Sequence, residues 1–289
     1  DTRLTKNAII QFIGKFCTTG LGFLSIALLT RELGPEQFGW YVSAVTLLQF
    51  VAIMADFGMI PLSAHFFSTS QNEEKTWGYL FGFRTATACA LLLPAPLLSY
   101  AFPYPDAVHT AAWMLSLSFI AIAIAQICIG FLQHKLLMGE HALADTLGSA
   151  ATVIGILIGM RLNWPFLALV GVLTSGTILT TSYLLFAVSR HVRIIPKYNK
   201  QEWKNIIKTM WPIAVAILFN VVYLKGDTLL LSWYADQKAV GLYGGAYRVI
   251  DIITQTAMML MGMMLPLFAA SWAKKQENDF AAYHKKAWL

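Results

Sequence analysis

The sequence predicts an all-α integral membrane protein, and its composition is the first observation behind this prediction. Of 289 residues, 57% are hydrophobic and only 12% are charged, whereas roughly a quarter are charged in an ordinary soluble domain. The chain also contains 9 Trp, 11 Tyr and 18 Phe residues. A soluble domain of this length could not bury so much apolar surface in a single core. Lipid is therefore the expected solvent for most of these side chains.

Eight apolar stretches are the second observation. A helix that crosses the hydrocarbon core of a bilayer needs about 20 mostly apolar residues. Such stretches lie at residues 9–30, 41–64, 80–101, 111–132, 143–161, 165–188, 208–233 and 241–270. The first is too long for a signal peptide and lacks a small-residue cleavage site, so we expect it to remain as a helix. We expect Pro61 and Pro266 to kink the second and the eighth helix.

The distribution of Lys and Arg is the third observation, and it predicts the orientation. With a cytoplasmic N-terminus, the cytoplasmic segments carry fourteen Lys and Arg residues, and the outer connectors carry three, Arg31, Arg161 and Lys238. Because cytoplasmic loops of membrane proteins carry such an excess, we expect the N-terminus inside. This confinement to connectors suits lipid headgroups better than nucleic acid. The short outer connectors leave no room for an extramembrane catalytic domain.

A basic connector at residues 189–207 divides the chain. Residues 1–188 form a predicted N-terminal lobe of six helices, and residues 208–289 form helices seven and eight with a cytoplasmic tail. Three apolar residues of the connector could form one side of an amphipathic helix: Trp203, Ile206 and Ile207. The connector is either a cytoplasmic linker with positive-inside charges or a helix that binds lipid.

An internal repeat links the two lobes. Shifting the sequence by 202 residues places RELGPEQFGWYVSAV over WYADQKAVGLYGGAY. The identical pairs are Leu29 and Leu231, Gly39 and Gly241, Tyr41 and Tyr243, and Ala44 and Ala246. We expect the glycine to supply the tight turn before each returning helix. Six helices separate the copies, so the repeats are expected to run parallel about an axis along the membrane normal. The second copy would then stop after two helices, and we expect a complete protein of about twelve.

Two segments resemble a known family. LLTRELGPEQFGWY (28–41), followed by ADFGM (55–59), resembles the polysaccharide transporters, or Wzx-type O-antigen flippases. These belong to the multidrug/oligosaccharidyl-lipid/polysaccharide (MOP) exporter superfamily. The stretch KGDTLLLSWYADQKAVGLYGGAYRVIDII (225–253) is similar to the seventh and eighth helices of that family. The resemblance covers the whole chain in topology, but its motifs occupy only about 60 residues.

The resemblance implies both a fold and a function. The fold would be a MOP-type transporter bundle, with a six-helix N-terminal lobe and the first two helices of the C-terminal lobe. The function would be to move an undecaprenyl-diphosphate-linked oligosaccharide from the cytoplasmic to the periplasmic leaflet of the bacterial inner membrane. Alternating access, coupled to H⁺ or Na⁺ and without another cofactor, is the implied mechanism. Other glycan-assembly membrane proteins stay open as partners, and this chain alone is not expected to transport.

Charged residues inside the predicted helices are the candidate site. Insertion scales put each central charge at about +2.5 to +3.5 kcal/mol, so we expect these groups to face a cavity or one another. The cations, which could hold a lipid diphosphate, are Lys15, Arg84, Lys225 and Arg248. The carboxylates, which could bind the coupling ion, are Asp227 and Asp251, with Asp56 as third choice.

Simpler explanations stay open for several of these charges. Lys15 and Arg84 could reach the inner headgroups with their long side chains, and Lys225 the outer ones. Arg248 and Asp251 are three residues apart and could form a structural ion pair. The polar residues of the fourth helix, Gln126, Gln133 and His134, either extend the cavity or mark its inner end. Cys17, Cys89 and Cys128 lack disulfide or zinc spacing and are expected to pack as small apolar residues.

Other functions are weighed against transport of lipid-linked sugar. A multidrug exporter moves cationic drugs, which four cations disfavour, whereas a lipid II flippase stays open. A membrane enzyme of glycan assembly needs an acid/base or nucleophilic set, and no paired carboxylate accompanies the histidines. A non-transporting scaffold would pair all its buried charges. Asp56-Phe57-Gly58 resembles a kinase motif, but no Gly-rich loop or strand lysine accompanies it.

Overall fold

The computed structural model describes residues 2–56, 59, 66–67, 72–135, 137–251 and 254, without the side chains of 2–13 and 15. The chain divides into two compact units, Asp1–Leu242 and Tyr243–Leu289. Most of the described residues belong to the first unit. Pro61, Pro266 and most of the predicted eighth helix lie outside the described residues, although residues 237–251 are helical.

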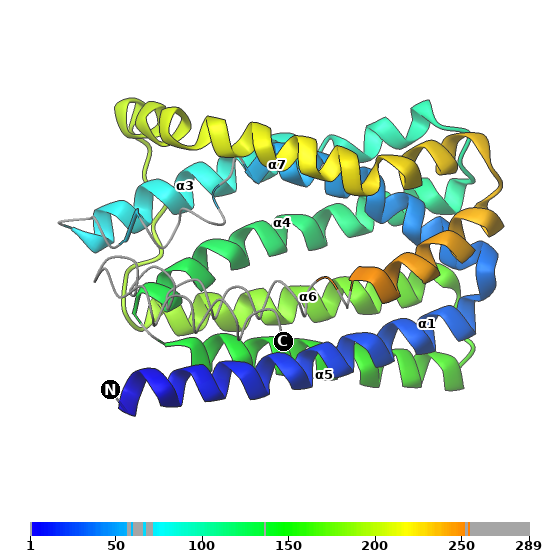
Figure 1. The fold of residues 1–289 in the computed structure, drawn as a ribbon, viewed down its shortest axis with the longest axis horizontal. Coiled ribbons are helices and arrows are strands. Elements are labelled where there is room, and N and C mark those ends of the chain that lie inside the picture. Colours follow the sequence, from blue (N-terminus) through cyan, green and yellow to red (C-terminus); the bar gives the residue numbers. More distant parts are fainter. Residues whose placement is uncertain are drawn as a thin grey trace, which may run out of the picture. The chain divides into compact units, whose positions relative to one another are not determined.

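The first unit is built from long helices that run alongside one another (Figure 1). They are α1 (Thr2–Asp56), α3 (Glu73–Leu92), the 3₁₀ helix η1 (Ala95–Ala101), α4 (Asp106–His134), α5 (Met138–Arg161), α6 (Phe166–Ser189) and α7 (Lys200–Tyr234). Helix is the only regular secondary structure in the described part of the chain. Six helical segments there are long and apolar enough to cross a membrane. The predicted all-α integral membrane fold is confirmed.

The predicted spans correspond to these helices with shifted ends. The first predicted span and residues 41–56 of the second lie in α1, which is two helices joined at a sharp bend, and most of residues 57–64 lie outside the described residues. The third span, predicted at 80–101, is instead α3 followed by η1, because Pro94 and Pro96 interrupt the α-helical hydrogen bonding. The fourth to seventh spans match α4 to α7, and α7 begins eight residues earlier than predicted.

The bend within α1 is at Gly34, not at Gly39 as the repeat predicted. Gly34 has φ 65° and ψ 178°, a conformation that only glycine adopts without strain. Pro35 follows as the first residue of the returning helix, where its missing N–H costs nothing. Gly39 lies inside that helix, so the prediction that it makes the turn is wrong.

The second copy of the repeat turns at the equivalent position. Position 34 corresponds to Asp236, which follows the end of α7. The Asp236 carboxylate accepts a hydrogen bond of 2.7 Å from the Ala239 backbone N–H and so caps the next helix. Gly34 and Asp236 are therefore both the residue that precedes a returning helix.

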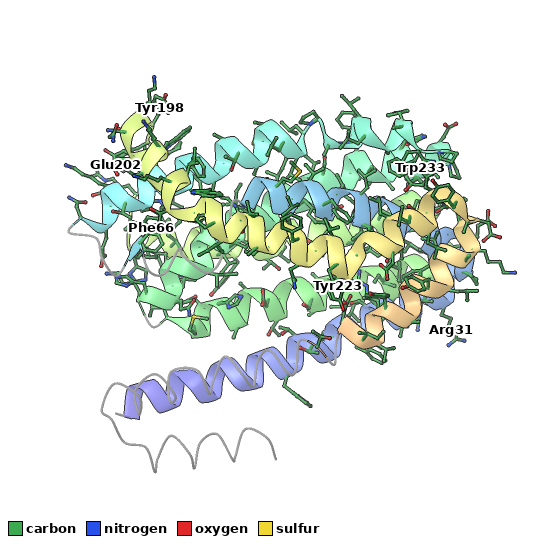
Figure 2. All side chains as sticks on the ribbon, turned by 45° about the horizontal axis from the view of Figure 1, so that its top comes forward. Arg31, Phe66, Tyr198, Glu202, Tyr223 and Trp233 are labelled. Carbon is green, nitrogen blue, oxygen red and sulfur yellow. The ribbon has the colours of Figure 1, made fainter. Side chains whose placement is uncertain are left out.

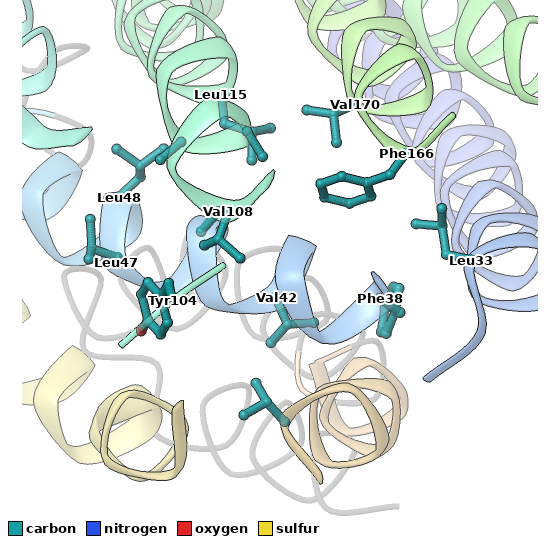
Figure 3. Close-up of a cluster of buried hydrophobic side chains, with 14 of the residues drawn as sticks. Leu33, Phe38, Val42, Leu47, Leu48, Tyr104, Val108, Leu115, Phe166 and Val170 are labelled. Atoms are coloured by element: carbon teal, nitrogen blue, oxygen red, sulfur yellow. The ribbon is translucent and has the colours of Figure 1, made fainter. Parts of the chain in front are cut away.

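Two apolar clusters hold the two ends of the first unit. The cluster at the turn end, the end with Gly34 and Asp236, gathers α1, η1, α4, α6 and Val240 (Figure 3). The cluster at the linker end, the end with residues 189–199, gathers α3, α4, α6 and the start of α7. Figure 2 shows Arg31 and Trp233 at the turn end and Tyr198 and Glu202 at the linker end.

The connector is docked on the bundle rather than free. The Lys197 backbone N–H donates to the Gly78 carbonyl over 2.8 Å. A Cβ added at Gly82 would lie 2.6 Å from the Lys197 carbonyl oxygen, so the two glycines of α3 leave a groove for the connector backbone. The connector is therefore fixed to α3 through its backbone.

The predicted amphipathic helix is the first part of α7. The helix begins at Lys200, and the Asn199 side chain caps it by accepting hydrogen bonds from the backbone N–H groups of Gln201 and Glu202. Ile206 is buried, and Trp203 packs edge-on against Phe83, with ring centroids 5.4 Å apart. This apolar side contacts protein through Trp203 and Ile206, whereas Ile207 is exposed, and the alternative in which the helix binds lipid stays a prediction.

Candidate functional site: charged groups inside the bundle

Arg84 is the centre of a buried polar cluster that joins three helices. It lies on α3 and is only 3% exposed. Its Nε donates to the Ala123 carbonyl on α4 over 3.2 Å, and its Nη1 donates to the Ala55 carbonyl in the last turn of α1 over 2.9 Å. Its Nη2 donates to the Gln126 Oε1 on α4 over 2.5 Å. One guanidinium thus connects α1, α3 and α4.

Asp56 is the counter-ion of Arg84. Its Oδ1 lies 2.8 Å from Arg84 Nη2, and both side chains are almost fully buried. The prediction that charges in the spans face one another is confirmed for this pair. The alternative in which Arg84 reaches the inner headgroups is wrong, because its guanidinium is held inside the bundle.

The saturation of Arg84 limits what this cluster can do chemically. Three guanidinium N–H groups donate hydrogen bonds to Ala123, Ala55 and Gln126, and Asp56 forms the ion pair, so little capacity is left for a diphosphate in this conformation. Protonation of Asp56 would leave the Arg84 charge buried without a counter-ion, which is strongly unfavourable. The Arg84–Asp56 pair therefore has the properties of an internal brace in this conformation, and the roles predicted for Arg84 and Asp56 in binding substrate and coupling ion stay predictions.

Lys225 and Asp227 lie in a different environment on α7. Helix α7 runs through Gly226 as a continuous helix. None of residues 211–227 is buried, and Tyr223 is 83% exposed (Figure 2). Lys225 is half-buried, and Asp227 is exposed and accepts a hydrogen bond of 2.6 Å from the Thr228 backbone N–H. These two charges therefore lie beside a face of α7 that the first unit does not cover.

The remaining predicted charges are not brought to this site by the described residues. The Lys15 side chain is outside the description, although its backbone is helical in α1. Arg248 and Asp251 belong to the second unit, where both are half-buried. Their predicted ion pair, and the gathering of the four cations in one cavity, stay predictions.

The polar residues of α4 divide between the cluster and the linker end. Gln126, as a partner of Arg84, is part of the buried cluster. His134 lies at the linker end, where its Nε2 is 3.1 Å from Glu73 Oε1, and Lys135 Nζ is 2.5 Å from Glu73 Oε2. The sequence marked Gln126 as polar within a span, but nothing in it indicated Glu73.

The cysteines and acidic residues show no metal chemistry in the part that the structure describes. Cys17, Cys89 and Cys128 are free thiols, and Cys128 is buried in the cluster at the linker end. No group of three His, Cys, Asp or Glu residues that could hold a metal ion occurs among the described residues.

Comparison with protein families identifies the group to which this bundle belongs. The family model described as "Polysaccharide biosynthesis protein" matches residues 4–272. The chain belongs to the polysaccharide biosynthesis protein family. This membership confirms the resemblance that the segments around Gly39 and Gly241 indicated.

Two relatives with named roles are similar to the chain over most of its length. "Succinoglycan biosynthesis transport protein ExoT" of Rhizobium meliloti (strain 1021) is 24% identical over 289 residues, which cover 96% of this chain and 56% of the relative. "Probable low-salt glycan biosynthesis flippase Agl15" of Haloferax volcanii is 24% identical over 283 residues, covering 96% of this chain and 57% of the relative. The chain thus spans little more than half the length of these relatives, whose names describe transporters.

Solved structures show the same fold. An inward-facing multidrug resistance MATE transporter of the MOP superfamily matches with a TM-score of 0.63 and 15% identity, over 97% of this chain and 69% of its own. A MOP superfamily transporter from Pyrococcus furiosus matches with a TM-score of 0.57 and 13% identity, over 99% and 68%. The predicted MOP-type transporter fold is therefore confirmed.

Proposed function

We propose that the protein containing this chain is a flippase that moves a lipid-linked oligosaccharide across the membrane by alternating access. The observation that carries the proposal is the family match over residues 4–272. The names of the two relatives, a succinoglycan transport protein and a glycan flippase, support a glycan as the cargo. The carrier is proposed to be undecaprenyl diphosphate, whose charge needs compensation inside the membrane.

The charges take two roles in this proposal. Lys15, Lys225 and Arg248 bind the diphosphate, and Asp227 and Asp251 bind the coupling H⁺ or Na⁺. The exposed face of α7 beside Lys225 and Asp227 supports these assignments, because such a face can border a path for the headgroup. Arg84 and Asp56 instead brace the N-terminal lobe, because Arg84 donates to α1 and α4 and forms an ion pair with Asp56.

The orientation follows from the charge asymmetry. The linker end, with its Lys and Arg residues between 190 and 208, is proposed to be cytoplasmic, and the turn end periplasmic. The membrane is proposed to be the bacterial inner membrane, where other membrane proteins of glycan assembly would supply and receive the substrate.

A flipping assay tests the proposal. The full-length protein is reconstituted in proteoliposomes with a fluorescent undecaprenyl-diphosphate oligosaccharide, and the fraction accessible in each leaflet is measured. We expect protein-dependent flipping, and at least a tenfold loss for Lys15→Gln combined with Lys225→Gln. Arg161→Gln, which removes an exposed charge at the end of α5, is the matched control and should flip normally.

Three outcomes would contradict parts of this assignment. Unchanged flipping by the double variant would remove Lys15 and Lys225 from the substrate site. Flipping of lipid II in preference to the oligosaccharide would redirect the cargo. Transport of cationic drugs without lipid flipping would identify a multidrug exporter of the same fold.

A further inference from the structure

The two copies of the repeat touch each other at the turn end, and they do so through their matched glycines. A Cβ added at Gly39 would overlap the Gln237 carbonyl oxygen, and a Cβ added at Gly241 would overlap the Pro35 carbonyl oxygen. The Gly241 Cβ would also lie 2.9 Å from the Gly39 backbone nitrogen. The returning helices of both copies therefore cross with their backbones in direct contact.

This crossing has the pattern of a two-fold interface. The repeat shift of 202 residues converts Pro35 into Gln237 and Gly39 into Gly241. Exchanging the two copies therefore turns the contact between Pro35 and Gly241 into the contact between Gln237 and Gly39. Residue i contacting j while j contacts i defines an isologous interface between two-fold related copies. The crossing thus lies on the local two-fold axis that relates the two copies of the repeat.

A chain of neutral hydrogen bonds surrounds the crossing. Ser43 Oγ donates to Gln237 Oε1 over 2.8 Å, and Tyr104 Oη lies 2.6 Å from Ser232 Oγ. Ser43, Tyr104 and Ser232 are buried and Gln237 is half-buried, so these bonds are largely shielded from solvent.

The chemistry of this contact suits repeated opening and closing. Neutral hydroxyl and amide groups can exchange their protein partners for water when the copies separate, without leaving an uncompensated charge. The glycine crossing brings the two backbones together, and opening would also expose Val240, which is buried in the cluster at the turn end. Helix α7 has no buried residue between 211 and 227, so separation at the turn end does not break a core along its middle.

We infer that the Gly39–Gly241 crossing and the hydrogen bonds of Ser43, Tyr104, Ser232 and Gln237 form the outer gate of the transporter. The inference rests on the proposed function, which places the turn end outside. The gate is closed in this structure, and it separates along the two-fold axis to release the sugar headgroup. The docked connector keeps the start of α7 on α3 while the turn end opens.

Cross-linking tests whether the gate must open. In the full-length protein without Cys17, Cys89 and Cys128, Ser43→Cys and Gln237→Cys are joined with a short bis-methanethiosulfonate reagent. We expect complete cross-linking to lower flipping at least tenfold, reduction to restore it, and the reagent to leave the flipping rate of each single variant unchanged. Normal flipping by fully cross-linked protein would overturn the gate and leave the proposed function standing.

A second measurement tests whether the glycines allow the gate to close, and it does not depend on flipping. Gly39→Ala places a methyl group against the Gln237 carbonyl, so the outer end cannot close fully. A cysteine at position 232 (Ser232→Cys) should then react at least fivefold faster with a membrane-impermeant maleimide added outside. Gly20→Ala, whose added Cβ meets nothing within 4 Å, is the matched control.

The labelling result separates the two proposals. If the unmodified protein does not flip the oligosaccharide, the proposed function fails, but faster labelling of the Gly39→Ala variant still supports the gate. Equal labelling rates in the Gly39→Ala and Gly20→Ala variants, with both proteins eluting as folded monodisperse species, would overturn the gate.

Discussion

Two charged regions of the first unit differ in their surroundings. Arg84 and Asp56 are buried, and Arg84 is also held by two carbonyls and Gln126. Lys225 and Asp227 lie on α7 next to residues that the unit leaves exposed. The difference teaches that a charge in a spanning helix is not by itself evidence of a transport site. What separates a brace from a candidate ligand is whether the surrounding helices already satisfy the charge.

The largest effect is expected from removing the counter-ion of Arg84. Asp56→Asn keeps the size of the side chain but leaves the Arg84 charge buried and unpaired. We expect the free energy of unfolding in mixed micelles to fall by about 3–5 kcal/mol. Asp227→Asn, at an exposed carboxylate, is the matched control and should change it by less than about 1 kcal/mol.

A second substitution added to Asp56→Asn can show whether the unpaired Arg84 charge causes the loss of stability. When Arg84→Gln is added to Asp56→Asn, the unpaired charge disappears, and part of the stability should return in a double-mutant cycle. A loss that is equal in the single and the double variant would mean that packing, not charge, explains the effect.

A smaller loss of stability is expected from the neutral partner of Arg84. Gln126→Leu removes the Oε1 acceptor of Arg84 but leaves Asp56 in place. A hydrogen bond to a charged group contributes about 1.5–3 kcal/mol, so the free energy of unfolding should fall within that range. Gln133→Leu, at an exposed position on the same helix, should have little effect. Equal effects of the two variants would contradict the brace.

Lys225 should separate stability from transport. Lys225→Gln is expected to change the free energy of unfolding by less than about 1 kcal/mol while lowering flipping at least tenfold. Unfolding in mixed micelles and the proteoliposome assay on the same preparation measure the two quantities. A large loss of stability with normal flipping would place Lys225 with Arg84 and remove the contrast between the two regions.

The smallest effect is expected at the linker end. Glu73 pairs with His134 and Lys135, but its side chain is 35% exposed. Ion pairs of this exposure contribute about 0–1 kcal/mol, so Glu73→Gln should lower the free energy of unfolding by no more than that. A loss as large as that of Asp56→Asn would show that exposure does not decide the strength of these pairs.

The sequence predicted the fold well because hydropathy counts the spans directly. The ends of α4, α5 and α6 were predicted within five residues, since their apolar stretches end near Pro105, Lys135, Arg161 and Pro165. The start of α7 was missed, because residues 200–207 are too polar for a span. Their helix is fixed by the Asn199 cap and by the packing of Trp203 and Ile206.

The candidate site was predictable in kind but not in arrangement. The cost of a charge in lipid predicts that Arg84 finds partners. It does not predict that Asp56, 28 positions earlier, is the partner, because that depends on the packing of α1 against α3. The repeat likewise identified Gly39 and Gly241 as special. In the structure, Gly34 makes the turn, and Gly39 and Gly241 lie where the two helices cross.

The length of α7 has a consequence for the bilayer around the protein. Its 35 residues correspond to about 52 Å at 1.5 Å per residue, whereas the hydrocarbon core of a typical bilayer is about 30 Å thick. The helix must therefore tilt or extend into the headgroup layer, and Trp211 and Trp233 stand where such a helix would meet the two interfaces. Because tilt responds to thickness, lipids with longer or shorter acyl chains would change the angle of α7 in the membrane.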